Sequence, residues 1–96
     1  MKVRVLRTGP FSVPTGARKY NQHHLLLIKH VVGAIERDAF RTEDAEADSF
    51  SAAVGVLNLQ TGDCLLDLET RVCVVVDRCV DSIRFVDVPR NRSMAS

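Results

Sequence analysis

The longest unbroken apolar run in the chain is Val72-Cys73-Val74-Val75-Val76, and it constrains the fold more than any other stretch. Successive side chains of a strand point to opposite faces, so Val72, Val74 and Val76 share one face while Cys73 and Val75 share the other. A strand with apolar residues on both faces is usually covered by other parts of the protein on both sides. The run therefore predicts an interior strand around which the rest of the chain is organised.

The chain has 96 residues, which is the size of one domain. Apolar residues make up 46% of it and charged residues 26%, proportions that are typical of a folded protein. We expect a single β-rich domain over residues 1–89, followed by a flexible basic tail over residues 90–96.

Three further stretches have the composition of strands. Residues 1–8 predict a first strand. Residues 53–68 predict a β-hairpin, because Gln60-Thr61-Gly62-Asp63 places a glycine where a turn favours a positive φ. Residues 82–88 predict the last strand, which ends before Pro89.

Residues 22–40 favour a helix, with a pair of strands as the alternative. β-branched residues weaken the helix hypothesis, and Gly33 costs roughly 1 kcal/mol relative to Ala. The acidic residues at 42–48 are compatible with a solvated loop and with a short helix. On a helical wheel one arc of about 120° holds Leu25, Ile28, Val31, Val32, Ile35 and Ala39.

These predictions combine into an α+β fold. We expect a sheet of four or five strands, mainly antiparallel because the connections are short, with one helix at about 22–40 on one face. One helix leaves the second face of the strand at 72–76 uncovered, and exposed apolar surface costs roughly 25 cal/mol per Å². A second copy or another protein is therefore predicted on that face. The alternative is an all-β small barrel, in which the sheet closes on itself.

Charge is distributed unevenly, although the formal net charge is only +1. Residues 1–41 carry eight Lys or Arg and two Asp or Glu, whereas residues 42–70 carry seven Asp or Glu and no Lys or Arg. The two segments are predicted to pair within or between subunits, or to leave a basic face for an anionic partner such as nucleic acid.

The basic residues define a candidate surface for anions or nucleic acid. In the helix hypothesis His23, His30 and Arg37 form one stripe opposite the apolar arc, for which an ordinary solvated face is the alternative interpretation. Aromatic platforms for bases are few and are not interleaved with the basic residues. The candidate anion-binding residues are Arg4, Arg7, Arg18, Lys19, His23, Lys29, His30 and Arg37.

The sequence contains no recognisable catalytic or metal-binding pattern. The three histidines lack HxxxH spacing, and no cysteine lies within thirty residues of them, so no metal site is predicted. Neither a phosphate-binding GxxxxGK[ST] loop nor a G-x-S-x-G nucleophile motif occurs. We expect a protein that is not an enzyme and that uses no cofactor.

Cysteine usage and hydropathy indicate the compartment. The three cysteines show no CxxC spacing and are predicted to be reduced thiols, with Cys73 and Cys79 in the core. No secretory signal pattern is found, and no apolar stretch approaches the ~20 residues of a membrane span. We expect an intracellular protein, cytoplasmic or nuclear, that does not span a membrane.

The leading functional hypothesis is a non-enzymatic interaction or assembly module. It self-associates as a homo-oligomer, or joins another protein subunit, through the second face or an edge of its sheet. The runner-up is a small β-barrel that binds RNA or DNA through a basic N-terminal surface. A weaker hypothesis is a small enzyme whose site forms only in an oligomer. The predicted interface residues are Val72, Val74, Val76, Cys73 and Val75.

Overall fold

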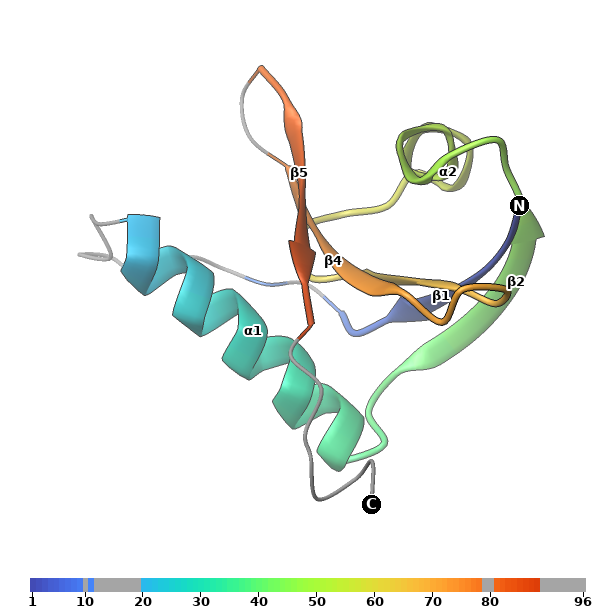
Figure 1. Ribbon diagram of the computed structural model, residues 1–96. Coiled ribbons are helices and arrows are strands. Elements are labelled where there is room, and N and C mark those ends of the chain that lie inside the picture. The colour runs from blue at the N-terminus through green and yellow to red at the C-terminus, as the bar shows by residue number, and fades with distance from the viewer. Residues whose placement is uncertain (10, 12–19, 79–80, 89–96) are drawn as a thin grey trace.

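Five antiparallel strands form one open sheet in the order β2-β1-β3-β4-β5 (Figure 1). The computed structural model describes residues 1–9, 11, 20–78 and 81–88, so the predicted tail at 90–96 lies outside the described residues. The predicted α+β fold is confirmed, and the closed barrel is wrong because the sheet has two edges. Along the chain the elements are β1 (Lys2–Arg7), α1 (Tyr20–Glu36), β2 (Arg41–Glu46), α2 (Phe50–Leu57), β3 (Cys64–Asp67), β4 (Cys73–Arg78) and β5 (Ile83–Asp87).

The apolar run at 72–76 lies mostly in β4, which is an interior strand between β3 and β5. Val74, Val75 and Val76 are buried, as the run predicted. Val72 precedes the strand and is 46% exposed. The middle position of the sheet belongs to β3 rather than to β4.

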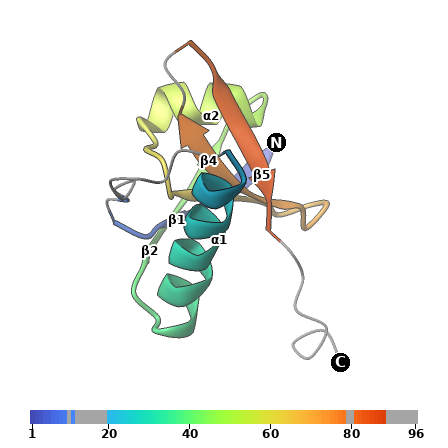
Figure 2. The same cartoon turned by 90° about the vertical axis from the view of Figure 1, so that its left-hand side faces the viewer.

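Each face of the sheet is covered by one helix of the same chain (Figures 1 and 2). On one face, the buried cluster contains Leu27 and Val31 of α1 with Val75 of β4. On the other face, Val54 of α2 lies in a cluster with Val74 of β4. The prediction of a single helix that leaves the second face bare is therefore wrong, because α2 supplies the second cover.

Helix α1 confirms the helix hypothesis for residues 22–40, although it begins at Tyr20 and ends at Glu36. It ends early because Asp38 adopts a left-handed conformation (φ 55°), which interrupts the helical backbone.

The buried face of α1 is rotated from the predicted apolar arc. Leu27, Val31 and Ala34 are buried, whereas Leu25 is 70% exposed. Apolar periodicity alone placed this face incorrectly, because the side of α1 that meets the sheet also contains two histidines.

Residues 53–57 belong to helix α2, so the predicted strand there, and the hairpin it belonged to, are wrong. The Ser49 side chain accepts a hydrogen bond from the Ala52 N–H at the start of the helix, at 3.1 Å. At its end, Asn58 adopts a left-handed conformation (φ 52°). These caps satisfy polar groups that a short helix otherwise leaves unpaired, and they outweigh the strand preference of the valines between them.

The predicted turn at residues 60–63 is present but connects different elements. Gly62 has the expected positive φ (102°), and the Gly62 N–H donates to the Val76 carbonyl at 3.0 Å. The turn therefore joins α2 to β3 and fixes this junction against β4.

Residues 41–46 form the edge strand β2, where the sequence indicated a loop or a short helix over 42–48. Arg4 Nε donates to Asp44 Oδ1 at 2.8 Å, which lowers the pKa of Asp44. Arg7 Nε donates to Glu43 Oε2 at 3.2 Å. The two ion pairs lie on opposite faces, since Arg4 and Arg7 are three positions apart in β1 and Glu43 and Asp44 are adjacent in β2. The basic and acidic segments thus pair within the chain, and this pairing supports the strand.

Two valines of α2 test its helical conformation. We expect Val54→Ala to lower the free energy of unfolding by about 2 kcal/mol, because the buried side chain leaves a cavity. Val56→Ala is the matched control and should change it by less than about 0.5 kcal/mol, because Val56 is 78% exposed. In a strand both side chains would share one face. Urea unfolding followed by circular dichroism measures both values, and equal losses would contradict the helix.

Candidate functional site

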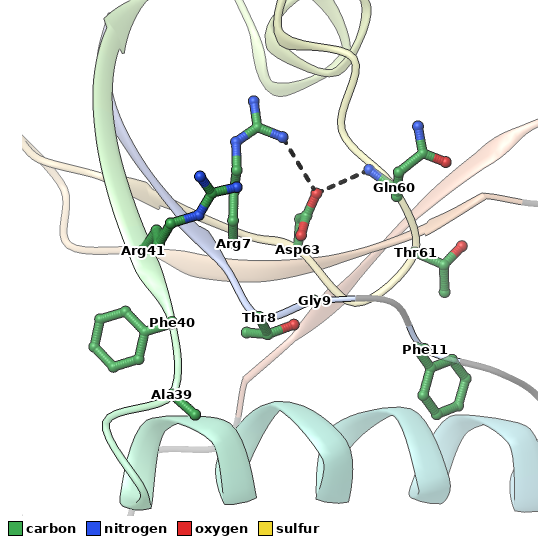
Figure 3. A pocket seen from close by; sticks show the side chains of 10 residues that line it. All are labelled: Arg7, Thr8, Gly9, Phe11, Ala39, Phe40, Arg41, Gln60, Thr61 and Asp63. Carbon is green, nitrogen blue, oxygen red and sulfur yellow. Dashed lines mark hydrogen bonds and ion pairs between the residues drawn. The ribbon is translucent and has the colours of Figure 1, made fainter.

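A hollow of about 700 Å³ lies at the end of the sheet where β1 ends and where β2 and β3 begin (Figure 3). Three segments that are distant in sequence meet there: the end of β1 with the residues after it, the α1–β2 connection with the start of β2, and the turn before β3. The hollow is lined by Arg7, Thr8, Gly9, Phe11, Ala39, Phe40, Arg41, Gln60, Thr61 and Asp63.

Arg7 and Arg41 lie directly opposite each other in the antiparallel pairing of β1 and β2. Residues in this relation point to the same face of a sheet, and the two guanidinium groups lie side by side at the hollow (Figure 3). Like charges directly opposite each other destabilise a strand pair. An anion between them would offset this repulsion and accept charge-assisted hydrogen bonds from both.

The two arginines differ in how firmly they are held. Arg7 donates from Nη2 to the Leu57 carbonyl at 2.9 Å and from Nε to Glu43, and its Nη1 lies 3.8 Å from Asp63 Oδ2. The Arg41 side chain is exposed and makes no hydrogen bond or ion pair with any residue that the structure describes. The hollow therefore combines one fixed guanidinium group with one that is available to a ligand.

Asp63 is a buried carboxylate in this hollow, with its side chain 7% exposed. Its Oδ2 accepts a hydrogen bond from the Gln60 N–H at 2.9 Å and faces Arg7. This carboxylate opposes an anionic ligand. Two guanidinium groups against one carboxylate nevertheless leave the lining with a net positive charge.

Two aromatic rings, those of Phe40 and Phe11, lie at opposite ends of the hollow (Figure 3). Phe11 packs against the imidazole rings of His23 and His30, with ring centroids 5.9 and 5.3 Å apart. The position of Phe11 is therefore set by α1, the helix that carries both histidines.

His23 and His30 were predicted in a solvent-facing stripe, but both bond to groups of the sheet side. His23 Nε2 donates to the buried Asp77 carboxylate, at 3.1 Å from Oδ2. Thr8 Oγ1 donates its proton to the Gly62 carbonyl at 2.7 Å, so it accepts from His30 Nε2 at 3.2 Å. This arrangement places a proton on Nε2 of His30. The helical wheel counted both histidines as polar and could not show their partners on distant segments.

The other basic candidates do not gather at the hollow. Among the described candidates, only Arg7 lines it. Arg4 is paired with β2 on the other face, and Lys29 and Arg37 are exposed on or just beyond α1. The remaining two candidates, Arg18 and Lys19, lie outside the described residues.

Sequence reasoning missed Arg41 and Phe40. Phe40 was the last residue of the predicted helix, and Arg41 lay between that helix and the acidic stretch at 42–48; the structure places them between α1 and the body of β2. The only sequence signal was the position of Arg41 at the junction of the basic and acidic segments. Its pairing with Arg7 depends on the register of two strands separated by α1.

The predicted interface residues are mostly covered by the chain itself. Val74, Val75 and Val76 are buried, and Cys73 is half-buried. Val72 is the exposed member of this set. Coverage by α1 and α2 removes the argument for association through an open face, and it leaves the sheet edges as candidate contacts.

No protein-family model matches the chain, and no curated protein or solved structure is significantly similar to it. Within residues 1–9, 11, 20–78 and 81–88, no group of three or more His, Cys, Asp or Glu is placed to hold a metal ion. Neither helix in this described part is long and apolar enough to cross a membrane.

The His23–Asp77 pair is expected to fix α1 on the sheet. His23→Phe and Asp77→Ala should each lower the free energy of unfolding by about 1–3 kcal/mol, because each leaves a largely buried polar group without its partner. The double variant should lose less than the sum of the two, by about 1 kcal/mol. Lys29→Gln, at an exposed position of the same helix, is the control and should stay within about 0.5 kcal/mol. Additive losses in urea unfolding at pH 7 would contradict the interaction.

Proposed function

We propose that this chain is a non-enzymatic binding module that holds single-stranded nucleic acid at the hollow at the end of its sheet. The observation that carries this proposal is the Arg7–Arg41 pair, two guanidinium groups directly opposite each other on one face. A phosphate group between them takes hydrogen bonds from both and neutralises their repulsion. An intracellular location, where such a ligand is available, is part of the proposal.

The aromatic rings support a single strand as the ligand. Bases of single-stranded nucleic acid stack on aromatic side chains, and each such contact is worth about 1–3 kcal/mol. Phe40 and Phe11 supply two rings at the same hollow as the arginines. Aromatic and basic residues are thus brought together in space, although they are not interleaved along the sequence. The volume of about 700 Å³ is in the range of sites for small molecules, which suits a nucleotide unit rather than a duplex.

Because carboxylates lie close to Arg7, we expect binding of an anion to depend mainly on Arg41. Glu43 and Asp63 both lie close to Arg7 and compensate much of its charge. Arg41 has no such compensation among the described residues. Removing Arg41 should therefore weaken binding more than removing a cation elsewhere on the surface.

A charge reversal at Arg41 tests the site. Fluorescence anisotropy with a labelled oligonucleotide of about ten nucleotides, within the usual range of site sizes, measures affinity at several salt concentrations. We expect Arg41→Glu to weaken binding about tenfold or more and to reduce the salt dependence by about 0.7 per lost phosphate contact. Arg71→Glu makes the same charge change in the β3–β4 connection, outside the hollow, and should stay within about twofold.

Equal losses in Arg41→Glu and Arg71→Glu would indicate diffuse electrostatic attraction and contradict a site at the hollow. A wild-type chain without measurable binding at low salt would contradict the proposal itself. Phe40→Leu keeps the charge and removes one ring. It should weaken binding of the oligonucleotide without changing competition by inorganic phosphate, because only the oligonucleotide has bases that stack.

Self-association through an edge of the sheet is a second candidate function, and the contrast between the two edges favours it. Four of six residues in β2 are charged, but only two of five in β5. Charged side chains protect an edge strand from pairing with another chain, so β5 is the less protected edge. In the described part of the chain no strand pairs with its outer side, and Ile83 is 36% exposed there.

A proline in β5 tests the edge contact. The Val88 N–H donates to the Cys73 carbonyl of β4, so the Asp87 N–H points away from the sheet, because N–H directions alternate along a strand. Asp87→Pro removes this outward donor without removing a bond to β4. We expect a dimer or larger assembly to become monomeric in size-exclusion chromatography with light scattering, with an unchanged circular dichroism spectrum. Asp87→Asn keeps the N–H and should keep the oligomer.

A wild-type monomer would contradict self-association as a whole. An assembly that survives Asp87→Pro with its fold intact would contradict β5 as the contact. Neither result affects the nucleic-acid proposal, whose readout is affinity for an oligonucleotide.

A further inference from the structure

Cys64 and Cys73 are free thiols on adjacent strands and belong to the cluster that α1 covers. In the β3–β4 register Cys64 lies opposite Val75, and Cys73 lies opposite Leu66. The two cysteines therefore occupy diagonal positions on one face. The two thiols are close enough for each to shift the pKa of the other. Diagonal neighbours lie farther apart than directly opposite residues, so a disulfide bond of ~2.0 Å between these thiols requires β3 and β4 to shift locally toward each other.

The two thiols differ in access and in acidity. Cys64 is fully buried, whereas Cys73 is half-buried. Interaction with Cys73, together with burial, raises the pKa of the Cys64 thiol, and interaction with Cys64 lowers the pKa of Cys73. The thiolate is the nucleophilic form of cysteine. Cys73 is therefore suited to meet an oxidant, whereas Cys64 is shielded from the oxidant and can react only with a group beside it, such as the oxidised Cys73.

We propose that Cys73 and Cys64 form a peroxide-responsive thiol pair, in which Cys73 is oxidised first and Cys64 then closes a disulfide between β3 and β4. The proposal rests on the strand register, the shared face and the unequal exposure of the two thiols. It is independent of nucleic-acid binding and of self-association.

The oxidant is hydrogen peroxide, and the reaction balances in two steps. The Cys73 thiolate attacks one peroxide oxygen, the O–O bond breaks, and a sulfenic acid forms while hydroxide leaves and takes a proton to become water. The Cys64 sulfur then attacks the sulfenic sulfur, the S–O bond breaks, and a second water leaves with the Cys64 proton. Two thiols lose two electrons, and one peroxide is reduced to two waters.

The disulfide would give the chain a covalently closed state next to the hollow. Cys64 directly follows Asp63, the carboxylate that faces Arg7. The cross-link would also close the short β3–β4 connection and join the two strands on which α1 packs.

Tryptic cleavage sites separate the two cysteines, so mass spectrometry of the peptides can identify the disulfide bond between them. The full chain with Cys79→Ser, which leaves only the two thiols of the pair, is reduced and treated with one equivalent of hydrogen peroxide. Trypsin cleaves after Arg41, Arg71 and Arg78, which places Cys64 in peptide 42–71 and Cys73 in peptide 72–78. We expect the intact mass to fall by about 2 Da, the mass of two hydrogens lost in disulfide formation. The two peptides should be joined and should separate on reduction.

Two variants in the same background assign the roles. With Cys64→Ala the Cys73 sulfenic acid should persist and be trapped by dimedone, because its resolving partner is gone; alanine avoids placing a hydroxyl in the apolar cluster. With Cys73→Ser the loss of the Cys64 thiol should slow about tenfold or more, because a buried thiol of raised pKa reacts poorly. Circular dichroism checks that both variants are folded.

A cross-link between peptides 42–71 and 72–78 within one monomer supports the pair. Sulfinic acid on Cys73 without a cross-link, or an intermolecular disulfide in its place, would overturn the proposal. Equal rates of Cys64 oxidation with and without Cys73 would also overturn it, because Cys64 would then react without its partner.

Discussion

The fold depends on burying both faces of the two interior strands β3 and β4. Cys64 and Leu65 in β3, and Val75 and Val76 in β4, point alternately to the two faces, and all four are buried. One helix from each side is enough to cover them, because α1 and α2 both lie over this part of the sheet. The strand β2 is left mostly exposed on both faces and is polar. Covered faces leave the end and the edge of the sheet for the contacts proposed above, at the hollow and at β5.

The sequence predicted the fold correctly where an apolar run could only be an interior strand. It predicted the wrong secondary structure where a helix or strand depends on contacts with distant residues. The unbroken apolar run at 72–76 required cover on both faces of the strand, and the structure supplies it. The covering element, α2, was predicted as a strand because a short run of Ala and Val has no decisive period. Its helical state depends on the caps at Ser49 and Asn58. The acidic segment became β2 only through its pairing with β1, which local composition could not indicate.

The site was predictable only in part, for a related reason. Arg7 was identified as a basic candidate, and it lines the hollow. His23 and His30 were assigned to solvent because they are polar, whereas their hydrogen bonds to Asp77 and Thr8 hold α1 and Phe11 against the sheet. Polarity in a helix sequence does not distinguish a solvated residue from one whose partner lies on another element. Arg41 needed the strand register, which is a property of the fold and not of any local pattern.

The position of Arg41 relative to the acidic segment strengthens the case for a ligand. The chain places seven acidic residues between 42 and 70, and β2 itself provides Glu43 to Arg7 and Asp44 to Arg4. Stability alone would favour an acid, rather than a second arginine, directly opposite Arg7. The described residues leave Arg41 uncompensated at the edge of the hollow. Local arrangements that cost stability occur preferentially at functional sites, where a bound group supplies the missing interaction. A phosphate group at this hollow would supply it, because it brings the negative charge that the strand pair lacks.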